Sequence, residues 1–317
     1  MSSRLRPRLL VGIFGAGAAA AYLFLPDKTR HAPTVDDASL SPSHFTRATL
    51  TSSEQSGPNT KLLVLTVPEF SKSKHASKLG PIWSVYIKDD DIQVERPYTP
   101  LEGIDEDGRM RFWIKKYPKG EVGRWLHSKK IGDQVEFRGP LSTWAWKENE
   151  WDEIVMISGG TGITPFYQFL HSSFSKGNDS KTRFTLLHSS PTPSELPPPA
   201  ILGPLREYAT THPEKFALHL FVDSRDGKQP AELPPLQVGR IQKSAIQRCL
   251  DPTPSPWWRS FFISTPSDVP RKTLFLVCGP EPMITAIAGP YGRNFSQGPV
   301  GGALAELGYT SSEVRKL

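Results

Sequence analysis

A glycine cluster near the middle of the chain could bind a phosphate group. An apolar run over residues 154–157 leads into the glycines, and a proline and a second apolar stretch follow them. This order predicts a strand, a tight turn and a helix, whose unpaired N–H groups and positive dipole end suit a pyrophosphate. An ordinary glycine-rich turn is the alternative interpretation of this motif taken alone. The candidate binding residues are Gly159, Gly160, Thr161, Gly162, Thr164 and Pro165.

Two stretches in the first half of the chain offer groups for an anion and a ring. Residues 95–100 read Glu-Arg-Pro-Tyr-Thr-Pro, in which arginine can fork onto a phosphate and tyrosine can contact a ring system. Residues 112–126 predict a strand, a glycine turn and a short helix, with a second set of backbone amides. Taken alone, they could be a turn closed by two prolines and a barrel strand with a capping helix. The candidates are Arg96, Pro97, Tyr98, Thr99, Ile114, Lys115, Tyr117, Gly120, Glu121, Val122 and Gly123.

A cysteine motif in the second half could also take part in chemistry. Cys278 follows a predicted apolar strand over residues 273–277 and begins the sequence Cys-Gly-Pro-Glu-Pro-Met. A free cysteine after a strand is commonly a small buried side chain. Because ligands bind at the carboxyl ends of parallel strands, we favour a place in a cleft. The candidates are Cys278, Gly279, Pro280, Pro282 and Met283.

Two kinds of predicted sheet must position these motifs. Short β-type runs between Gly, Pro, Asp and Ser clusters fill residues 45–137 and predict a small antiparallel barrel or sandwich. In the second half, strands over residues 184–187, 216–222 and 273–277 alternate with helical segments, which predicts a doubly wound parallel sheet. The strands predicted in the first half are residues 45–50, 61–67, 82–87, 92–94, 110–114 and 134–137.

Composition and charge exclude several classes of function. With 317 residues, 37% of them hydrophobic and 22% charged, the chain can form two globular domains. Residues 1–30 carry four of the six net positive charges, so the nearly neutral remainder argues against nucleic acid as a partner. The two cysteines, Cys249 and Cys278, cannot build a four-cysteine zinc or iron–sulfur site, and we predict no metal centre. Electron transfer would therefore need a bound organic cofactor.

The first 30 residues are typical of a targeting and anchoring segment. An acid-free start rich in arginine and serine precedes residues 9–26, an uncharged stretch that begins at Leu9, ends at Pro26 and is just long enough to span a bilayer. We expect a membrane helix here and a mitochondrial membrane as the location. The inner membrane facing the intermembrane space is favoured over the outer membrane. A secretory signal is the alternative interpretation.

Five motifs, in this order and spacing, resemble the NADH–cytochrome b5 reductase branch of the ferredoxin-reductase-type flavoproteins, in particular its fungal mitochondrial members. They are residues 96–99, 114–117, 130–140, 159–165 and 278–283. The resemblance implies an antiparallel FAD-binding β-barrel followed by an α/β doubly wound NAD-binding domain. The expected domains are residues 1–30 for targeting and anchoring, 31–42 as a linker, 43–147 for FAD, and 148–317 for NAD(P) with a C-terminal extension.

The resemblance also implies how the first domain binds FAD. Arg96 would hold the FAD phosphates, Tyr98 and Thr99 would contact the flavin, and the amides of residues 120–123 would meet the pyrophosphate. Thr164 would reach the flavin across the domain boundary. The family usually has serine or threonine where Gly123 stands, so we expect one phosphate hydrogen bond fewer and weaker FAD binding.

For the second domain, the resemblance implies an NADH cleft formed by residues 159–162 and 278–283, with Cys278 beside the nicotinamide. Tyr98, Thr99 and Cys278 are therefore the residues expected at the catalytic centre. We expect NADH rather than NADPH, because no arginine placed to meet a 2′-phosphate follows the strand that ends at Ser190. No clear ribose-binding acid follows this strand either.

The expected function is that of a membrane-anchored FAD-dependent NAD(P)H oxidoreductase. Electrons would pass from NADH through FAD to a haem acceptor of the cytochrome b5 or cytochrome c type. Hydride transfer needs no side-chain base, so His127, His171 and His188 are expected to be structural or surface residues. The alternative is a mitochondrial cytochrome c import or haem-attachment factor that mainly binds partners. The proline-rich stretches 191–204 and 251–270 and the tail after residue 298 favour this alternative.

Overall fold

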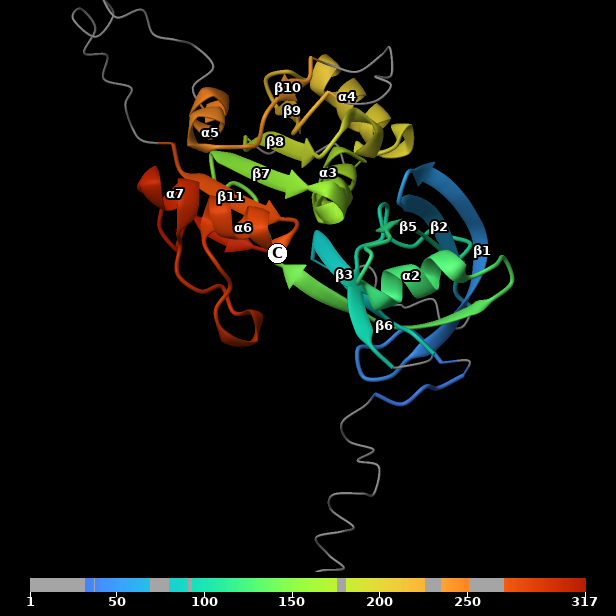
Figure 1. Ribbon diagram of the computed structural model, residues 1–317. Helices are drawn as coiled ribbons and strands as arrows, with labels where there is room; N and C mark the ends of the chain where they lie inside the picture. The colour runs from blue at the N-terminus through green and yellow to red at the C-terminus, as the bar shows by residue number, and fades with distance from the viewer. Residues whose placement is uncertain are drawn as a thin grey trace, which may run out of the picture.

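The described part of the protein forms two six-stranded sheets side by side, each covered by helices (Figure 1). This computed structural model describes residues 32–36, 38–68, 80–90, 93–175, 181–225, 235–250 and 271–317. The predicted membrane helix of residues 9–26 lies outside them. Within the described ranges, no helix is both long and apolar enough to cross a membrane.

The first sheet is antiparallel, as the sequence predicts, with the strand order β4-β3-β6-β1-β2-β5. Its edges β4 and β5 do not pair with each other among the described residues, so it is an open sheet rather than a closed hydrogen-bonded barrel. The strand predicted over residues 92–94 is displaced, because β4 begins at Glu95; Ile92 lies outside the described residues. The strands are β1 Thr46–Gly57, β2 Thr60–Thr66, β3 Ile82–Lys88, β4 Glu95–Tyr98, β5 Arg109–Lys115 and β6 Gln134–Trp144.

The second sheet is parallel throughout, with the strand order β10-β9-β8-β7-β11-β12. Its centre is β7, in which every residue is buried, as expected for an apolar strand covered on both faces. The strands are β7 Glu153–Gly159, β8 Arg183–Ser190, β9 Phe216–Val222, β10 Gln237–Val238, β11 Thr273–Cys278 and β12 Val314–Lys316.

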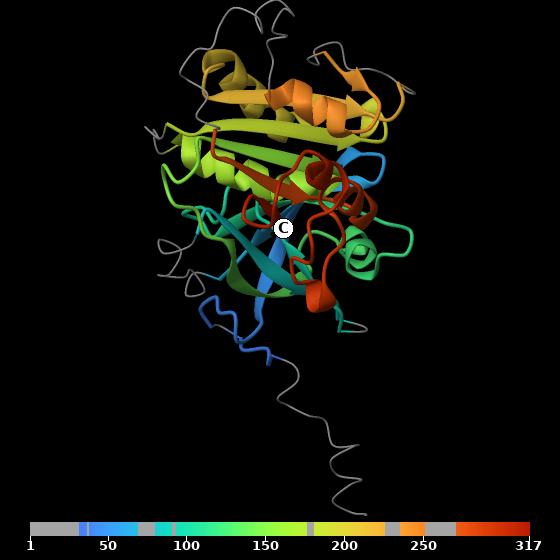
Figure 2. The ribbon, with the colours of Figure 1, turned by 90° about the vertical axis from the view of Figure 1, so that its left-hand side faces the viewer.

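Helices cover both faces of the parallel sheet, which confirms the doubly wound prediction (Figures 1 and 2). The helices α3 and α4 pack on the face toward the first sheet, and α5, α6 and α7 pack on the other. The proline-rich stretch 191–204 contains η4 and the start of α4, whereas the stretch 251–270 lies outside the described residues. The helical segments here are η3 Gly160–Ile163, α3 Thr164–Ser175, η4 Pro193–Glu195, α4 Pro199–Thr211, α5 Lys243–Leu250, α6 Glu281–Ala288, η6 Arg293–Phe295 and α7 Gly302–Glu306.

A shared core fixes the two sheets to each other. Ile82 and Trp113 of the first sheet belong to the same buried cluster as Phe166 of α3. The buried side chain of Gln168, also in α3, accepts a hydrogen bond from Trp83 N at 2.8 Å and donates one to Pro100 O at 2.8 Å. Since both ends of this amide are paired across the boundary, α3 holds the two sheets at one spacing.

Candidate active site between the two sheets

A cavity of about 740 Å³ lies where the two domains meet, within the roughly 300–1,000 Å³ usual for ligand sites. It brings most of the sequence-predicted site residues together. Gly160, Pro282 and Met283 are the predicted residues that do not line it. The predicted residues in its wall are Arg96, Pro97, Tyr98, Thr99, Ile114, Lys115, Tyr117, Gly120, Glu121, Val122, Gly123, Gly159, Thr161, Gly162, Thr164, Pro165, Cys278, Gly279 and Pro280.

The edge strand β4 carries the arginine and tyrosine of the first motif. The alternative of a turn closed by two prolines is therefore wrong: Pro97 sits in the strand opposite Tyr86, and an edge position tolerates a residue that lacks an N–H. Arg96 is exposed, with its Nη1 donating to Glu95 O at 2.8 Å. Burial raises the pKa of the Tyr98 phenol above its ordinary value, so its hydroxyl remains a hydrogen-bond donor at neutral pH.

The helix α2, Glu121–Ser128, begins at the cavity wall. Gly120 is its N-cap and provides no side-chain cap. Its first-turn amides therefore remain available to a ligand in a cavity that residues 120–123 line. Glu121 places a carboxylate in this first turn, but its side chain is exposed and can turn toward water.

Three contacts hold α2 against the end of β5. A Cβ at Gly123 would lie 2.8 Å from Lys115 O, so glycine is what permits this close approach of helix and strand. His127 Nε2 lies 3.1 Å from Ile114 O, and burial lowers the pKa of this histidine. Lys61 Nζ donates to His127 O at 2.9 Å, a favourable place for a cation near the negative end of a helix.

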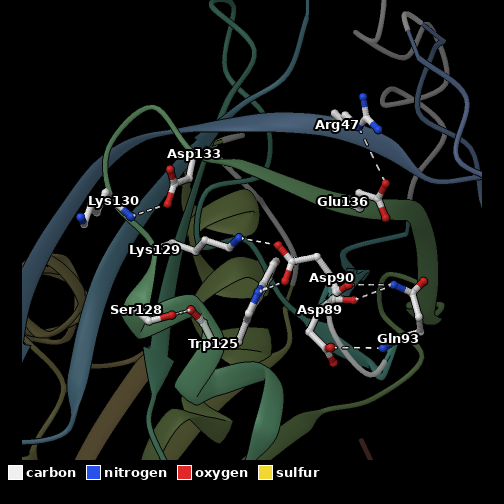
Figure 3. Close-up of polar contacts among 10 residues, drawn as sticks. All are labelled: Arg47, Asp89, Asp90, Gln93, Trp125, Ser128, Lys129, Lys130, Asp133 and Glu136. Atoms are coloured by element: carbon white, nitrogen blue, oxygen red, sulfur yellow. Dashed lines mark hydrogen bonds and ion pairs between the residues drawn. The ribbon is translucent and has the colours of Figure 1, made fainter.

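The far end of α2 is tied to the turn between β3 and β4 (Figure 3). Trp125 Nε1 donates to Asp90 Oδ1, and Lys129 Nζ lies 2.7 Å from Asp90 Oδ2. The hydrogen bond from Lys129 lowers the pKa of Asp90. Within the turn itself, Asp89 accepts from Gln93 N at 3.2 Å. Together these contacts fix the direction of α2 with respect to the sheet.

The glycine turn after β7 packs directly on the cysteine motif. A Cβ at Gly162 would collide with the backbone carbonyl of Cys278, so only glycine allows η3 to lie against the end of β11. The predicted strand, turn and helix are present, with η3 between β7 and α3 and Pro165 in the first turn of α3. Met283 instead packs behind this turn, where a Cβ at Gly159 would lie 2.6 Å from its sulfur.

Cys278 ends β11 and lines the cavity, as expected from its place at a strand end. It stands opposite Ser158, the residue that precedes the glycine turn. Burial raises the pKa of its thiol to about 12, so the group is uncharged at neutral pH. Cys278 therefore offers a small neutral wall rather than a reactive thiolate.

A fully buried histidine lies beneath the glycine turn. His188 Nδ1 is 2.8 Å from Ser158 Oγ, and Nε2 is 3.1 Å from Ser190 Oγ. Burial lowers the pKa of His188 to about 3, so the ring is neutral and uses one nitrogen as donor and the other as acceptor. His188 is structural, as the sequence predicts.

Several residues in the cavity wall are missing from the sequence prediction. Alternation along β3 could have indicated Ile82, Ser84 and Tyr86, since they share one face of the strand. No local signal points to Leu317, which reaches the cavity because β12 runs beside β11 and Leu317 N donates to Val277 O at 2.9 Å. The others are Phe112, Trp113, Lys119 and Thr143.

The wall chemistry fits anionic dinucleotides. The cations Arg96, Lys115 and Lys119 and the amides of α2 can meet phosphates, while Tyr98 and Trp113 offer rings to an aromatic heterocycle. Gly159, Thr161 and Gly162 of the glycine turn, a second candidate for binding phosphate, line the same cavity from the other domain. One cavity can therefore bring two cofactors into contact across the domain boundary.

Comparisons with known proteins agree with this chemistry. An oxidoreductase FAD-binding domain matches residues 47–146, and an oxidoreductase NAD-binding domain matches residues 156–289. NADH-cytochrome b5 reductase 2 of Scheffersomyces stipitis is 32% identical over 267 residues, which cover 84% of this chain and 81% of the relative. The protein of that name from Mycosarcoma maydis is 30% identical over 89% of this chain and 75% of its own length.

A solved structure shares the fold. The cytochrome b5 reductase domain of Ulva prolifera nitrate reductase superposes with a TM-score of 0.64 at 20% identity, covering 88% of this chain and all of that one. The likeness in fold, the relatives above 30% identity and the paired cofactor domains agree. The chain therefore belongs to the NADH–cytochrome b5 reductase family and is an FAD-dependent NADH oxidoreductase.

Proposed function

We propose that the natural acceptor of this reductase is a haem protein of the cytochrome b5 or cytochrome c type. The observation that carries this proposal is the similarity to relatives named NADH-cytochrome b5 reductase 2, and the cavity at the domain boundary supports it by joining residues of both cofactor domains. FAD held there would supply the chemistry that links a two-electron hydride donor to a one-electron acceptor such as a haem iron. The names of the fungal relatives support cytochrome b5 as the acceptor.

In this proposal the first domain holds FAD. Arg96 binds its phosphates, the amides of residues 120–123 bind its pyrophosphate, and Tyr98 and Thr99 orient the flavin. These roles are supported by the common cavity in which the residues lie. No side-chain base is required for hydride transfer, which agrees with the protonated, neutral states of Tyr98 and Cys278.

The second domain, in turn, receives NADH. Residues 159–162 take its phosphates, and Thr164 meets the flavin from the start of α3. Cys278 packs beside the nicotinamide, where a small neutral side chain leaves room for the ring. The contact of Gly162 with the Cys278 carbonyl supports this assignment, because it keeps the turn and the cysteine in one wall.

The acceptor can be identified by supplying candidates to the pre-reduced protein. Anaerobic stopped-flow mixing with oxidised cytochrome b5 and with oxidised cytochrome c, using ferricyanide as a control, gives the electron-transfer rate to each. We expect reduction of cytochrome b5 or cytochrome c at a rate that falls with rising salt, as an encounter between charged surfaces does. Rapid reduction of ferricyanide with neither cytochrome reduced would contradict a haem acceptor of these types.

We also propose that residues 1–30 target the protein to a mitochondrial membrane and anchor it there, the inner membrane facing the intermembrane space being favoured. The arginine-rich start and the uncharged residues 9–26 support this. Residues 1–35 fused to a fluorescent protein should label mitochondria and stay in the membrane after carbonate extraction. Labelling of the secretory pathway would contradict the proposed location.

A further inference from the structure

An ion pair crosses the domain boundary at the cavity wall. Lys115, the last residue of β5, lines the cavity, and its Nζ lies 2.7 Å from Glu195 Oε2 in η4. The side chains of Lys115 and Glu195 keep only 16% and 21% of their surface exposed. A pair this sheltered is screened less by salt than a surface pair, so Glu195 restrains the lysine ammonium.

The second domain holds Glu195 firmly. Leu196, the next residue, is buried in an apolar cluster of that domain. The Glu195 N–H donates to Thr192 O at 3.1 Å, and Ser190 Oγ donates to Glu195 O at 3.2 Å. On the other side, Ser194 O lies near Gly57 of the first domain, so η4 sits in the boundary between the two.

The hydrogen bonds that hold η4 extend to the base of the glycine turn at residues 159–162. Ser190 contacts His188, and His188 contacts Ser158, which directly precedes the glycine turn. A series of polar contacts thus connects the base of that turn with Lys115 on the opposite wall. Because burial lowers the pKa of His188 to about 3, protonation of the ring does not disturb these contacts at neutral pH.

We propose that Glu195 is a positioning residue for NADH, which fixes the Lys115 ammonium where the dinucleotide diphosphate must pass between the domains. A lysine side chain carries enough rotamer freedom that ordering it on binding can weaken affinity by up to about 30-fold. Glu195 removes that penalty before NADH arrives. This role rests on the NADH reductase activity and is independent of the proposed haem acceptor.

The test compares Glu195→Gln, which removes the charge but keeps the shape, with Glu102→Gln. Glu102 also lies at the boundary, accepting from Tyr167 Oη at 3.3 Å and pairing with Arg111, but it does not line the cavity. The first readout is the dissociation constant of NAD⁺ for the oxidised, FAD-loaded full-length protein, followed through the flavin absorbance. The others are Tm, the FAD dissociation constant, and KM and kcat with ferricyanide.

We expect Glu195→Gln to raise the NAD⁺ dissociation constant and the KM for NADH about fivefold to twentyfold, with kcat changed less than about twofold. FAD affinity should not change. Glu102→Gln should lower Tm without altering NAD⁺ affinity. Lys115→Met should weaken NAD⁺ binding, and adding Glu195→Gln to it should cause no further loss, since Glu195 acts through Lys115.

Several results would overturn this role. An unchanged NAD⁺ affinity in Glu195→Gln would show that the carboxylate has no effect on NAD⁺ binding. A tighter affinity would show that it competes with the diphosphate for Lys115. An equal rise in Glu102→Gln would show a loosened boundary. Additive losses in the double variant would show that Glu195 acts elsewhere, and a loss confined to FAD would assign Lys115 to the flavin. Should Glu195→Gln not fold, Glu195→Asp must raise the NAD⁺ dissociation constant above that of the parent protein and leave the FAD dissociation constant unchanged; a parental NAD⁺ dissociation constant would overturn the role.

Discussion

At the scale of the residue, burial keeps Tyr98, Cys278 and His188 uncharged at and beside the site. Burial raises the pKa of Cys278 to about 12 and lowers that of His188 to about 3, and it also raises the pKa of Tyr98. Among the described residues that line the cavity, the charged side chains are therefore Arg96, Lys115 and Lys119, against the carboxylate of Glu121. An anionic dinucleotide thus meets a cavity whose polarity does not change over the physiological pH range.

His188 should make stability depend on pH. Its pKa is about 3 when folded and about 6.5 when unfolded, so the stabilisation is complete above pH 6.5 and is lost as pH falls toward 3. Between pH 7 and pH 4.5 this group alone should cost about 2–3 kcal/mol of unfolding free energy. Urea titrations should show a shallower loss for His188→Asn than for the parent protein. Equal losses would mean that His188 does not govern this pH dependence.

Two substitutions at Gly123 distinguish the steric need for glycine from the loss of a hydrogen bond to an FAD phosphate. A Cβ here meets Lys115 O, a backbone atom that cannot easily move, so Gly123→Ala should cost about 1–3 kcal/mol in stability and weaken FAD binding. Gly123→Ser adds a hydroxyl to the same Cβ. If that hydroxyl reaches a phosphate, FAD should bind about fivefold tighter to the serine than to the alanine variant. Fluorescence titration of the apoprotein with FAD measures both; an alanine variant with parental affinity and Tm would contradict the close packing.

At the scale of the element, the two ends of α2 have different tasks. Its first turn lines the cavity, whereas its last turn is held by Asp90 through Trp125 and Lys129 (Figure 3). The turn between β3 and β4 thereby sets the direction in which the helix amides point. Residues outside the cavity thus influence how the cavity presents its donors.

Asp90→Asn should weaken FAD binding without removing any group from the cavity. The Asp90 side chain is 62% exposed, so its pair with Lys129 contributes no more than about 1 kcal/mol. We therefore expect the FAD dissociation constant to rise about twofold to fivefold. Asp105→Asn is the matched control, since Asp105 pairs with Arg109 on the same domain, away from the cavity. FAD titrations of both apoproteins check this. Equal effects of the two variants would rule out a specific role for the turn.

Apolar runs of four residues or more predicted strands, whereas strands of two or three residues gave no signal. The apolar run of β9 gave its bounds correctly, and the glycine and cysteine motifs led to the cavity. By contrast, β10 and β12 have two and three residues, too few for a periodic signal. The predicted strand missed the position of β4 because of Pro97, since a proline argues against a strand unless that strand is known to lie at a sheet edge. Leu317 and Glu195 reach the site through tertiary packing alone.

At the scale of the whole molecule, polar contacts between the two domains span the domain boundary. Gln168 joins α3 to the first sheet, and the Lys115–Glu195 pair joins η4 to β5. These contacts hold the two walls of the cavity together, which suits hydride transfer, because the reacting rings must be held in contact. A reductase built this way depends on the spacing of two sheets more than on any single catalytic side chain.

The function of this chain depends on its binding FAD and on the reduction of that FAD by NADH. The most direct measurement is the absorbance spectrum of the purified full-length protein, recorded anaerobically before and after NADH is added, with NADPH in a parallel cuvette. We predict a flavin band that NADH bleaches rapidly and NADPH bleaches more slowly. A protein that stays colourless after FAD is supplied, or a bound flavin that NADH leaves oxidised, would contradict the account.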